Sequence, residues 1–232
     1  MLLSLVISMM TLAFNVQPVK ASGSIYIRAD GSIDPTSAPV STSDEVTYSI
    51  TGSIGDSIVV ERSNVMINGK GFTVKGSGNG TGIELRAVAN VTIKDVYVAD
   101  FQYGVHLRLG CNISVLGSYL MDNQYGVFLN ATCNSTISKN NVMNSTSYGI
   151  WLGSNSSGNT VSKNQIAVNY CGIQIEESWD NTVCQNNLVK NDMQVNIVAP
   201  SPGNIWDEGL SLVRQLLERL QRDRRREWSL SE

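Results

Sequence analysis

The sequence YGVHLR at residues 103–108 returns as YGVFLN at residues 125–130 and as YGIWLG at residues 148–153. The same Gly-aliphatic-x-aliphatic core also begins at Gly82 and Gly172, which spaces the five glycines 22 or 23 residues apart. A second series runs in phase with the first and begins at Asn90, Asn112, Asn134, Asn159 and Asn181. A fixed period of this length indicates a repeat architecture.

Each repeat contains short segments in which apolar and polar residues alternate, separated by Asn, Gly and Ser. Alternation of this kind is typical of β-strands, and the absence of a 3.6-residue pattern excludes helical solenoids. A unit of this length with two or three strands has the size of one coil of a parallel β-helix. We therefore predict an all-β protein, a right-handed single-stranded parallel β-helix over residues 57–209, with N-terminal strands or a cap over residues 22–56.

Coils of a β-helix stack about 4.8 Å apart, so equivalent residues form columns. Alternation predicts three inward aliphatic columns, represented by Val105, Val127 and Ile150, by Val115, Ile137 and Val161, and by Leu120, Val142 and Ile166. At one turn the register predicts a ladder of amides, at Asn140, Asn164 and Asn186. We also expect the glycine before each strand to adopt a backbone conformation that other residues avoid. A ladder of tyrosines before these glycines is interpreted as structural, at positions 103, 125 and 148.

Between the inward positions lies a column that is predicted to face solvent: Glu84, His106, Phe128, Trp151, Gln174 and Asn196. Phe128 and Trp151 are expected to be exposed neighbours on a flat sheet, a surface that suits the apolar faces of sugar rings. The alternative is that the two rings pack only on each other across the strands. We take His106, Phe128 and Trp151 as the candidate ligand-binding residues.

Asp100 and Asp122 are one repeat apart, a separation at which two carboxylates can hydrolyse a glycosidic bond. The same column could hold Ca²⁺ through oxygen ligands. The alternative is that these aspartates form turns and bond their own backbone. A second acidic group lies on one coil, at Glu176, Glu177 and Asp180. No Arg or Lys is expected beside either group, which argues against an elimination mechanism.

Other classes of site find little support in the composition. The chain has one histidine, His106, and no Cys-x-x-Cys pair, so we predict no cofactor and no metal site other than the Ca²⁺ alternative at the aspartate column. Residues 22–209 carry 10 basic and 16 acidic residues, a net charge of −6, which argues against nucleic acid as a partner. Cys111 and Cys133 fall at equivalent positions on adjacent coils, within the range of a disulfide, whereas Cys171 and Cys184 lie on different parts of the coil.

The N-terminus predicts export. Residues 1–14 are uncharged and largely apolar, and small residues follow at a cleavage point before Ser22, so residues 1–21 are interpreted as a signal peptide. We expect a secreted, periplasmic or cell-surface protein with no membrane span after removal of the signal. Seven asparagines stand in Asn-x-Ser/Thr sequons, which are either sites of glycosylation on an exported chain or a consequence of the Asn and Thr that the repeat requires: Asn79, Asn90, Asn112, Asn130, Asn134, Asn144 and Asn155.

The repeats and the segment GNIWDEG at residues 203–209 resemble the NosD-like family of right-handed parallel β-helix proteins. Members are common among exported archaeal and bacterial surface proteins and share the broad architecture of pectin lyases and of carbohydrate-binding or sugar-hydrolysing domains. The resemblance implies the fold and export. The family name also implies periplasmic copper binding and maturation of nitrous oxide reductase, but no second histidine joins His106 and no Met/Cys cluster is expected in one column, so copper is not supported.

Residues 210–232 differ from the repeats, because the stretch LSLVRQLLERLQRDRRREW is rich in Arg and has an amphipathic helical pattern. One interpretation is a basic helical tail that caps the stack or docks a partner. The other is a one-base frameshift, since codons permitted for residues 210–222 encode, one base later, a motif like the one that follows this point in the resembled family.

Three functions follow from these observations. The preferred one is noncatalytic binding of a glycan or another extracellular polymer, because of the outward aromatic residues Phe128 and Trp151. The first alternative is a polysaccharide hydrolase or lyase that uses Asp100 and Asp122. The second is a NosD-type accessory protein for metalloenzyme maturation.

Overall fold

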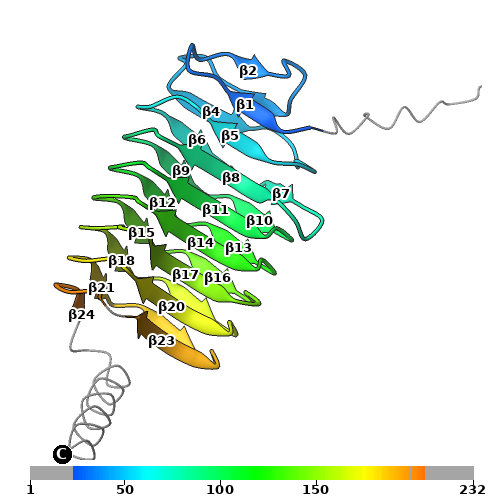
Figure 1. Cartoon of the computed structure of the whole chain (residues 1–232). Coiled ribbons are helices and arrows are strands. Elements are labelled where there is room, and N and C mark those ends of the chain that lie inside the picture. The colour runs from blue at the N-terminus through cyan, green and yellow to red at the C-terminus, as the bar shows by residue number, and fades with distance from the viewer. Residues whose placement is uncertain (1–22, 199, 207–232) are drawn as a thin grey trace, which may run out of the picture.

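The computed structural model describes residues 23–198 and 200–206, and within these residues every regular element is a β-strand. The strands stack in coils around one long core (Figure 1). The predicted signal peptide and the Arg-rich tail, with its frameshift hypothesis, lie outside the described residues. Nothing in the described part of the chain forms a helix that could cross a bilayer.

Three sheets, A, B and C, form the sides of the stack. Sheet A has nine strands, in the spatial order β2 (Ile33–Asp34), β1 (Ile25–Ile27), β5 (Ile58–Val60), β8 (Thr81–Arg86), β11 (Tyr103–Arg108), β14 (Tyr125–Asn130), β17 (Tyr148–Gly153), β20 (Cys171–Glu176) and β23 (Met193–Val198). Sheet B has nine strands, in the spatial order β24 (Ile205–Trp206), β21 (Thr182–Cys184), β18 (Thr160–Ser162), β15 (Thr136–Ser138), β12 (Ser114–Leu116), β9 (Thr92–Lys94), β6 (Met66–Asn68), β4 (Thr47–Ile50) and β3 (Val40–Ser41). Sheet C has six strands, in the spatial order β22 (Asn187–Val189), β19 (Gln165–Ala167), β16 (Asn141–Met143), β13 (Tyr119–Met121), β10 (Tyr97–Ala99) and β7 (Thr73–Lys75).

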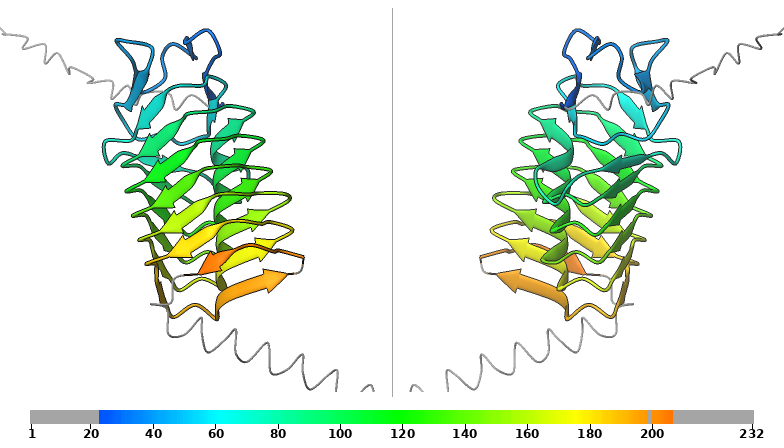
Figure 2. Two further views of the ribbon diagram at one scale, coloured as in Figure 1. Left: turned by 90° about the vertical axis from the view of Figure 1, so that its left-hand side faces the viewer. Right: turned by 90° about the vertical axis from the view of Figure 1, so that its right-hand side faces the viewer.

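From β8 onward the chain visits sheets A, B and C in turn and returns to sheet A one coil further along (Figure 2). Neighbouring coils pair in parallel and in the predicted register, so that Val105 pairs with Val127 and Val127 pairs with Ile150. The prediction of a parallel β-helix is therefore confirmed. It follows that residues one repeat apart are spatial neighbours throughout the stack.

The interior of the stack is aliphatic, as the alternation predicts. All members of the three inward columns are buried, and most have no exposed surface, as at Val105, Ile137 and Leu120. Burying an aliphatic side chain of this size stabilises the fold by about 1.5–3 kcal/mol relative to leaving it exposed. Because no single coil can bury its inward residues alone, stability depends on the stack as a whole.

Buried amide ladders line the corners of the stack. The predicted ladder is confirmed: the side-chain amide of Asn140 donates to Asn164 Oδ1, and that of Asn164 donates to Asn186 Oδ1. Two further ladders were not predicted, one joining Asn159, Asn181 and Asn204 and the other joining Asn169 to Asn191. Each ladder supplies hydrogen-bond partners to buried turn backbone, which would be costly to leave unpaired.

The repeated glycine has a different role from the one expected. Gly104 and Gly126 are absent from the residues with positive φ, so their backbone conformation is ordinary. Instead, a Cβ atom on Gly126 would lie 2.5 Å from the carbonyl oxygen of Gly149 on the next coil. Left-handed backbone occurs at several other columns, one of which, with φ between 55° and 60°, contains Asp100, Asp122, Asn144, Val168 and Lys190. The glycines are therefore required by the close approach of neighbouring coils.

The N-terminal end of the stack is closed by antiparallel strands. β2 pairs with β1 and β3 pairs with β4 in antiparallel fashion (Figure 2), whereas β1 and β4 themselves continue sheets A and B in parallel. Tyr48 is fully buried there and donates its hydroxyl to the carbonyl oxygen of Gly31 at 2.8 Å. The antiparallel strands occupy edges that would otherwise be open to pairing with another chain.

Candidate functional site

The outward face of sheet A carries a cluster of aromatic side chains. Six rings lie together on β11, β14 and β17, and we call them the aromatic strip: Tyr103, His106, Tyr125, Phe128, Tyr148 and Trp151. The register pairs His106 with Phe128 and Phe128 with Trp151 on successive strands. The structure therefore brings the three candidate ligand-binding residues together in one column.

The rings of this column stack on one another along the axis of the β-helix. The ring centroids of His106 and Phe128 are 4.9 Å apart, and those of Phe128 and Trp151 are 4.2 Å apart, with interplanar angles of 16° and 18°. Phe128 is consequently covered on both faces and is only 5% exposed. The expectation that Phe128 is exposed is wrong, because the spacing between coils, about 4.8 Å, is close to an aromatic stacking distance.

The tyrosine ladder belongs to the same surface. Tyr103 stacks on His106 with a centroid distance of 4.9 Å, and the ring centroids of Tyr125 and Trp151 are 5.5 Å apart. Tyr148 meets Trp151 edge-on at 5.2 Å. Burial raises the pKa of the Tyr103 and Tyr148 hydroxyls, so both are protonated at neutral pH. These hydroxyls add polar groups to the rim of an otherwise apolar surface.

Trp151 is the half-buried end of the stack. A Cβ atom on Gly153, two residues further along β17, would lie 2.9 Å from Trp151 Nε1, so the indole lies over the glycine. Trp151 Nε1 and His106 Nε2 are both buried without a hydrogen-bond partner. Buried polar atoms are nearly always paired. The described residues leave two more unpaired outside the strip, Asn141 Oδ1 and Ser145 Oγ.

Charged residues lie at one end of the strip. Arg86 pairs with Arg108 in the register of β8 and β11, and both side chains are exposed. Burial lowers the pKa of His106, opposed by Glu84 and assisted by Arg108, so the imidazole is neutral at pH 7. The sequence reasoning missed the two arginines, although each stands two residues after an outward residue of the predicted column.

The acidic column lies at a different corner, between sheets C and A. Asp100 and Asp122 occupy left-handed turns on neighbouring coils, and the side-chain amide of Asn144 donates to Asp122 Oδ1 at 3.1 Å. The expectation that no lysine lies beside this group is wrong, because Lys75 Nζ lies 3.2 Å from Asp100 Oδ2. The Gly-rich loop at 76–80 obscured the register of Lys75, which pairs with Ala99.

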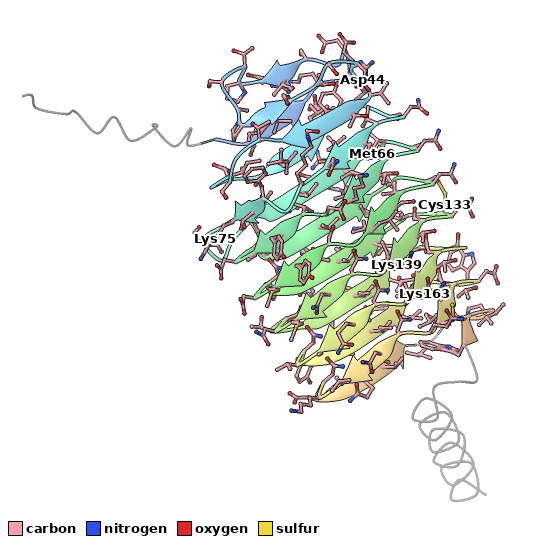
Figure 3. All side chains as sticks on the ribbon, turned by 180° about the vertical axis from the view of Figure 1, so that it is seen from behind. Asp44, Met66, Lys75, Cys133, Lys139 and Lys163 are labelled. Carbon is pink, nitrogen blue, oxygen red and sulfur yellow. A yellow bond between two sulfur atoms is a disulfide. The ribbon has the colours of Figure 1, made fainter. Side chains whose placement is uncertain are left out.

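An open cleft of about 730 Å³ adjoins this corner. It is lined by residues 53–57, by Lys75 and by the Gly-rich loop, with Phe101 also in its wall. Figure 3 places Lys75 on the side of the stack opposite Cys133. The cleft therefore lies away from the disulfide corner and next to the aspartate column.

The soft metal donors are dispersed over different sheets. His106 is packed between the rings of Tyr103 and Phe128 on sheet A. Contrary to expectation, thioethers do share a column, because Met121 pairs with Met143 on sheet C, and Met193 likewise pairs with Cys171 on sheet A. Burial raises the pKa of the Cys171 thiol to about 11, which keeps it protonated.

Copper is bound in proteins by several converging imidazole, thiolate or thioether groups. The described residues contain no group of three or more His, Cys, Asp or Glu side chains placed to hold a metal ion. Glu176, Glu177 and Asp180, which are close in sequence, do not form such a group either. Within the described part of the chain, the imidazole, thiol and thioether groups lie apart and do not converge as a copper centre requires.

A disulfide joins Cys111 to Cys133 at the corner between sheets A and B (Figure 3). Their Cα atoms are 4.5 Å apart, as the in-register position predicts, and the bond links two adjacent coils. Cys171 and Cys184 are free thiols, the first buried and the second half-buried.

Several solved structures are similar to this chain. The chain is similar to DFA-IIIase from Arthrobacter chlorophenolicus A6 (17% identity, TM-score 0.42, 66% of this chain and 38% of that chain). It is also similar to tailspike protein 2 from Escherichia coli O157:H7 bacteriophage CAB120 (15% identity, TM-score 0.47, 68% and 31%) and to a putative glycosyl hydrolase from Parabacteroides merdae ATCC 43184 (14% identity, TM-score 0.34, 69% and 77%). The chain spans about a third of the length of the first two proteins.

No curated protein matches the chain. The family described as periplasmic copper-binding protein (NosD) matches residues 22–214, which include every coil of the stack. The repeat, the parallel β-helix and this match agree, and the chain belongs to the NosD family.

Proposed function

We propose that this protein is an exported, noncatalytic β-helix that binds a polysaccharide along the outward face of sheet A. The observation that carries the proposal is the aromatic strip, where aromatic rings and tyrosine hydroxyls share one face. Sugars combine apolar C–H faces with hydroxyl groups, and binding sites for such ligands combine apolar walls with a few polar groups. The strip has this composition.

The arrangement suits a polymer better than a single sugar. The rings of His106, Phe128 and Trp151 repeat from coil to coil, about 4.8 Å apart. A chain laid along the axis of the β-helix would meet equivalent contacts at each coil, so that weak contacts add along its length. Because the rings stack on each other, their edges and the rim of Trp151 would make these contacts.

Two observations support export. A disulfide joins Cys111 and Cys133, and such bonds persist in oxidising compartments outside the cytosol. The family to which the chain belongs is described as periplasmic. Fractionation of the native host would test this part: recovery of the protein in the cytosol with reduced Cys111 and Cys133 would contradict it.

Binding is tested with the full-length protein on a panel of immobilised polysaccharides, followed by affinity measurement for each positive. Trp151→Ala should weaken binding at least tenfold, the loss typical of an aromatic anchor worth more than about 1.4 kcal/mol. The matched control is Trp179→Ala, which removes an indole that is 37% exposed at the corner between sheets A and B. Both variants are assayed below their melting temperatures. Equal affinity of the two variants, or no binding by the unmodified protein, would contradict the proposal.

Cleavage is a second candidate, favoured by two carboxylates one coil apart beside Lys75 and the open cleft. Its signature would be the release of new reducing ends from a polysaccharide that the protein binds. Asp100→Asn and Asp122→Asn should each abolish that release without lowering affinity for the polymer. If the unmodified protein binds a polymer for many hours and releases no ends, cleavage of that polymer is ruled out.

A further inference from the structure

We infer that the polymer bound on sheet A is anionic and that Arg108 holds its carboxylate or sulfate groups. The inference rests on the proposed function and adds the chemical class of the ligand. It comes from the comparison of two neighbouring coils that share an arginine at one outward position and differ at the other, where His106 stands in register with Glu84.

On β8 these two positions are Glu84 and Arg86, and they neutralise each other. Arg86 Nη2 donates to Glu84 Oε1 at 3.0 Å. The face of sheet A therefore already shows a carboxylate held by a guanidinium in its outer column. Guanidinium groups suit this task because their planar donors match the geometry of a carboxylate.

On β11 the same positions hold His106 and Arg108, in direct register with Glu84 and Arg86. The imidazole replaces the carboxylate and is uncharged at pH 7, because burial lowers its pKa. Within the described residues no carboxylate forms an ion pair with Arg108. One coil of the face is thus internally neutral, and the next keeps an uncompensated positive charge.

The neighbours of Arg108 leave this charge accessible. Its register partners are Arg86 on one side and Asn130 on the other, and Gly153 follows Asn130 in the same column. Asn130 has a short, uncharged side chain beside Arg108, and the indole of Trp151 covers Gly153 further along the column.

The position of Arg108 also fits the rest of the proposed site. Arg108 lies on the same strand as His106, and the next coils present Phe128 and Trp151. An acidic sugar held at Arg108 would therefore place the adjoining units of the polymer against the aromatic strip. Charge and ring contacts would act on one ligand in one orientation.

The experiment uses two matched pairs of probes with the full-length protein. Oligogalacturonate is compared with its methyl ester, and dextran sulfate is compared with dextran, so that each pair differs in charge and the two pairs distinguish a carboxylate from a sulfate. We expect the charged member of at least one pair to bind at least tenfold more tightly at low salt. Its affinity should fall as salt rises, because ion pairs at an exposed site are screened.

Three variants locate the charge that matters. Arg108→Gln should lower the affinity for the charged probe at least tenfold and leave the affinity for the neutral probe unchanged. Glu84→Gln should tighten binding of the charged probe several-fold, because it frees Arg86 from its internal partner. Lys163→Gln is the control, since it removes one positive charge at the corner between sheets B and C (Figure 3).

The outcomes separate the two proposals. If the charged and neutral probes bind equally well and Trp151→Ala weakens both, the proposed function stands and the inference is wrong. If Arg108→Gln and Lys163→Gln have equal effects, binding follows net charge and the assignment of Arg108 is wrong. If Glu84→Gln weakens binding of the charged probe, the comparison of the two coils is wrong. If none of the four probes and no polymer of the panel binds, both proposals fail.

Discussion

Replacing Asn164 by Ala should destabilise the stack more than any exposed substitution. Asn164 Oδ1 accepts the backbone N–H of Asn140 at 2.9 Å and the side-chain amide of Asn140 at 3.1 Å. Its own amide donates to the carbonyl oxygen of Ile137 at 2.8 Å and to Asn186 Oδ1 at 2.9 Å. Alanine removes all four hydrogen bonds from the interior of one corner.

The magnitude follows from the groups left without partners. The N–H of Asn140 and the carbonyl oxygen of Ile137 lose these partners in a buried corner. The carbonyl oxygen of Ile137 keeps its ladder bond between β15 and β18, so the N–H of Asn140 is the group that is orphaned, and an orphaned buried polar group costs about 1–3 kcal/mol. Folded proteins are typically stable by about 5–15 kcal/mol, so the loss would be a large share of the total.

The assay is urea unfolding of the full-length protein, followed by circular dichroism, with Asn187→Ala as the matched control. Asn187 is exposed and makes a surface hydrogen bond to Gln165 at 2.6 Å, so its replacement should change the free energy of unfolding by about 0.5 kcal/mol or less. Equal slopes of free energy against urea concentration would show that both variants unfold the same structure. The reasoning is refuted if Asn164→Ala is as stable as Asn187→Ala with the slope unchanged.

Three further predictions concern the repeated glycines, the disulfide and the buried histidine. Gly126→Ala should lower the melting temperature strongly, because its methyl would lie 2.5 Å from a backbone oxygen, whereas Gly52→Ala, with its nearest contact at 3.4 Å, should change it little; equal shifts would contradict the steric argument. Replacing both Cys111 and Cys133 by Ser should cost about 3 kcal/mol of stability in urea, the loop entropy of a 22-residue link, and a reducing agent should no longer affect that variant. The lowered pKa of His106 means that the unfolded chain binds its proton more tightly, so stability should be full above about pH 6.5 and fall as the pH drops below it; His106→Phe should flatten this decline, and an unchanged pH profile would contradict the assignment.

Much of the fold could be predicted because a solenoid turns sequence period into spatial neighbourhood. The repeat spacing placed Val105 against Val127, aligned Asn140 with Asn164, and brought Cys111 to Cys133. None of these predictions needs a side-chain conformation. They require only that each coil has the same length and that successive coils stack in register.

The site was predicted less completely, because contact between side chains depends on their size and direction. The column of His106, Phe128 and Trp151 was found, but the stacking that buries Phe128 was not. Lys75 reaches Asp100 across a loop whose extra residues disturb the period. The left-handed backbone at Val168 was missed for a different reason, because a β-branched residue such as valine rarely adopts that conformation.

The sequence by itself determined the parallel β-helix, the inward columns and the family, because these follow from periodicity, and periodicity can be read from a single chain. Only the tertiary structure decided which outward residues form a surface. It showed that the glycines exist to let backbones approach, that the aromatic rings cover one another's faces, and that Arg108 lacks the carboxylate that Arg86 has in Glu84. The physical reason is that burial and pairing depend on the size and direction of the side chains that meet between coils. The distances between these side chains cannot be read from the residue types alone.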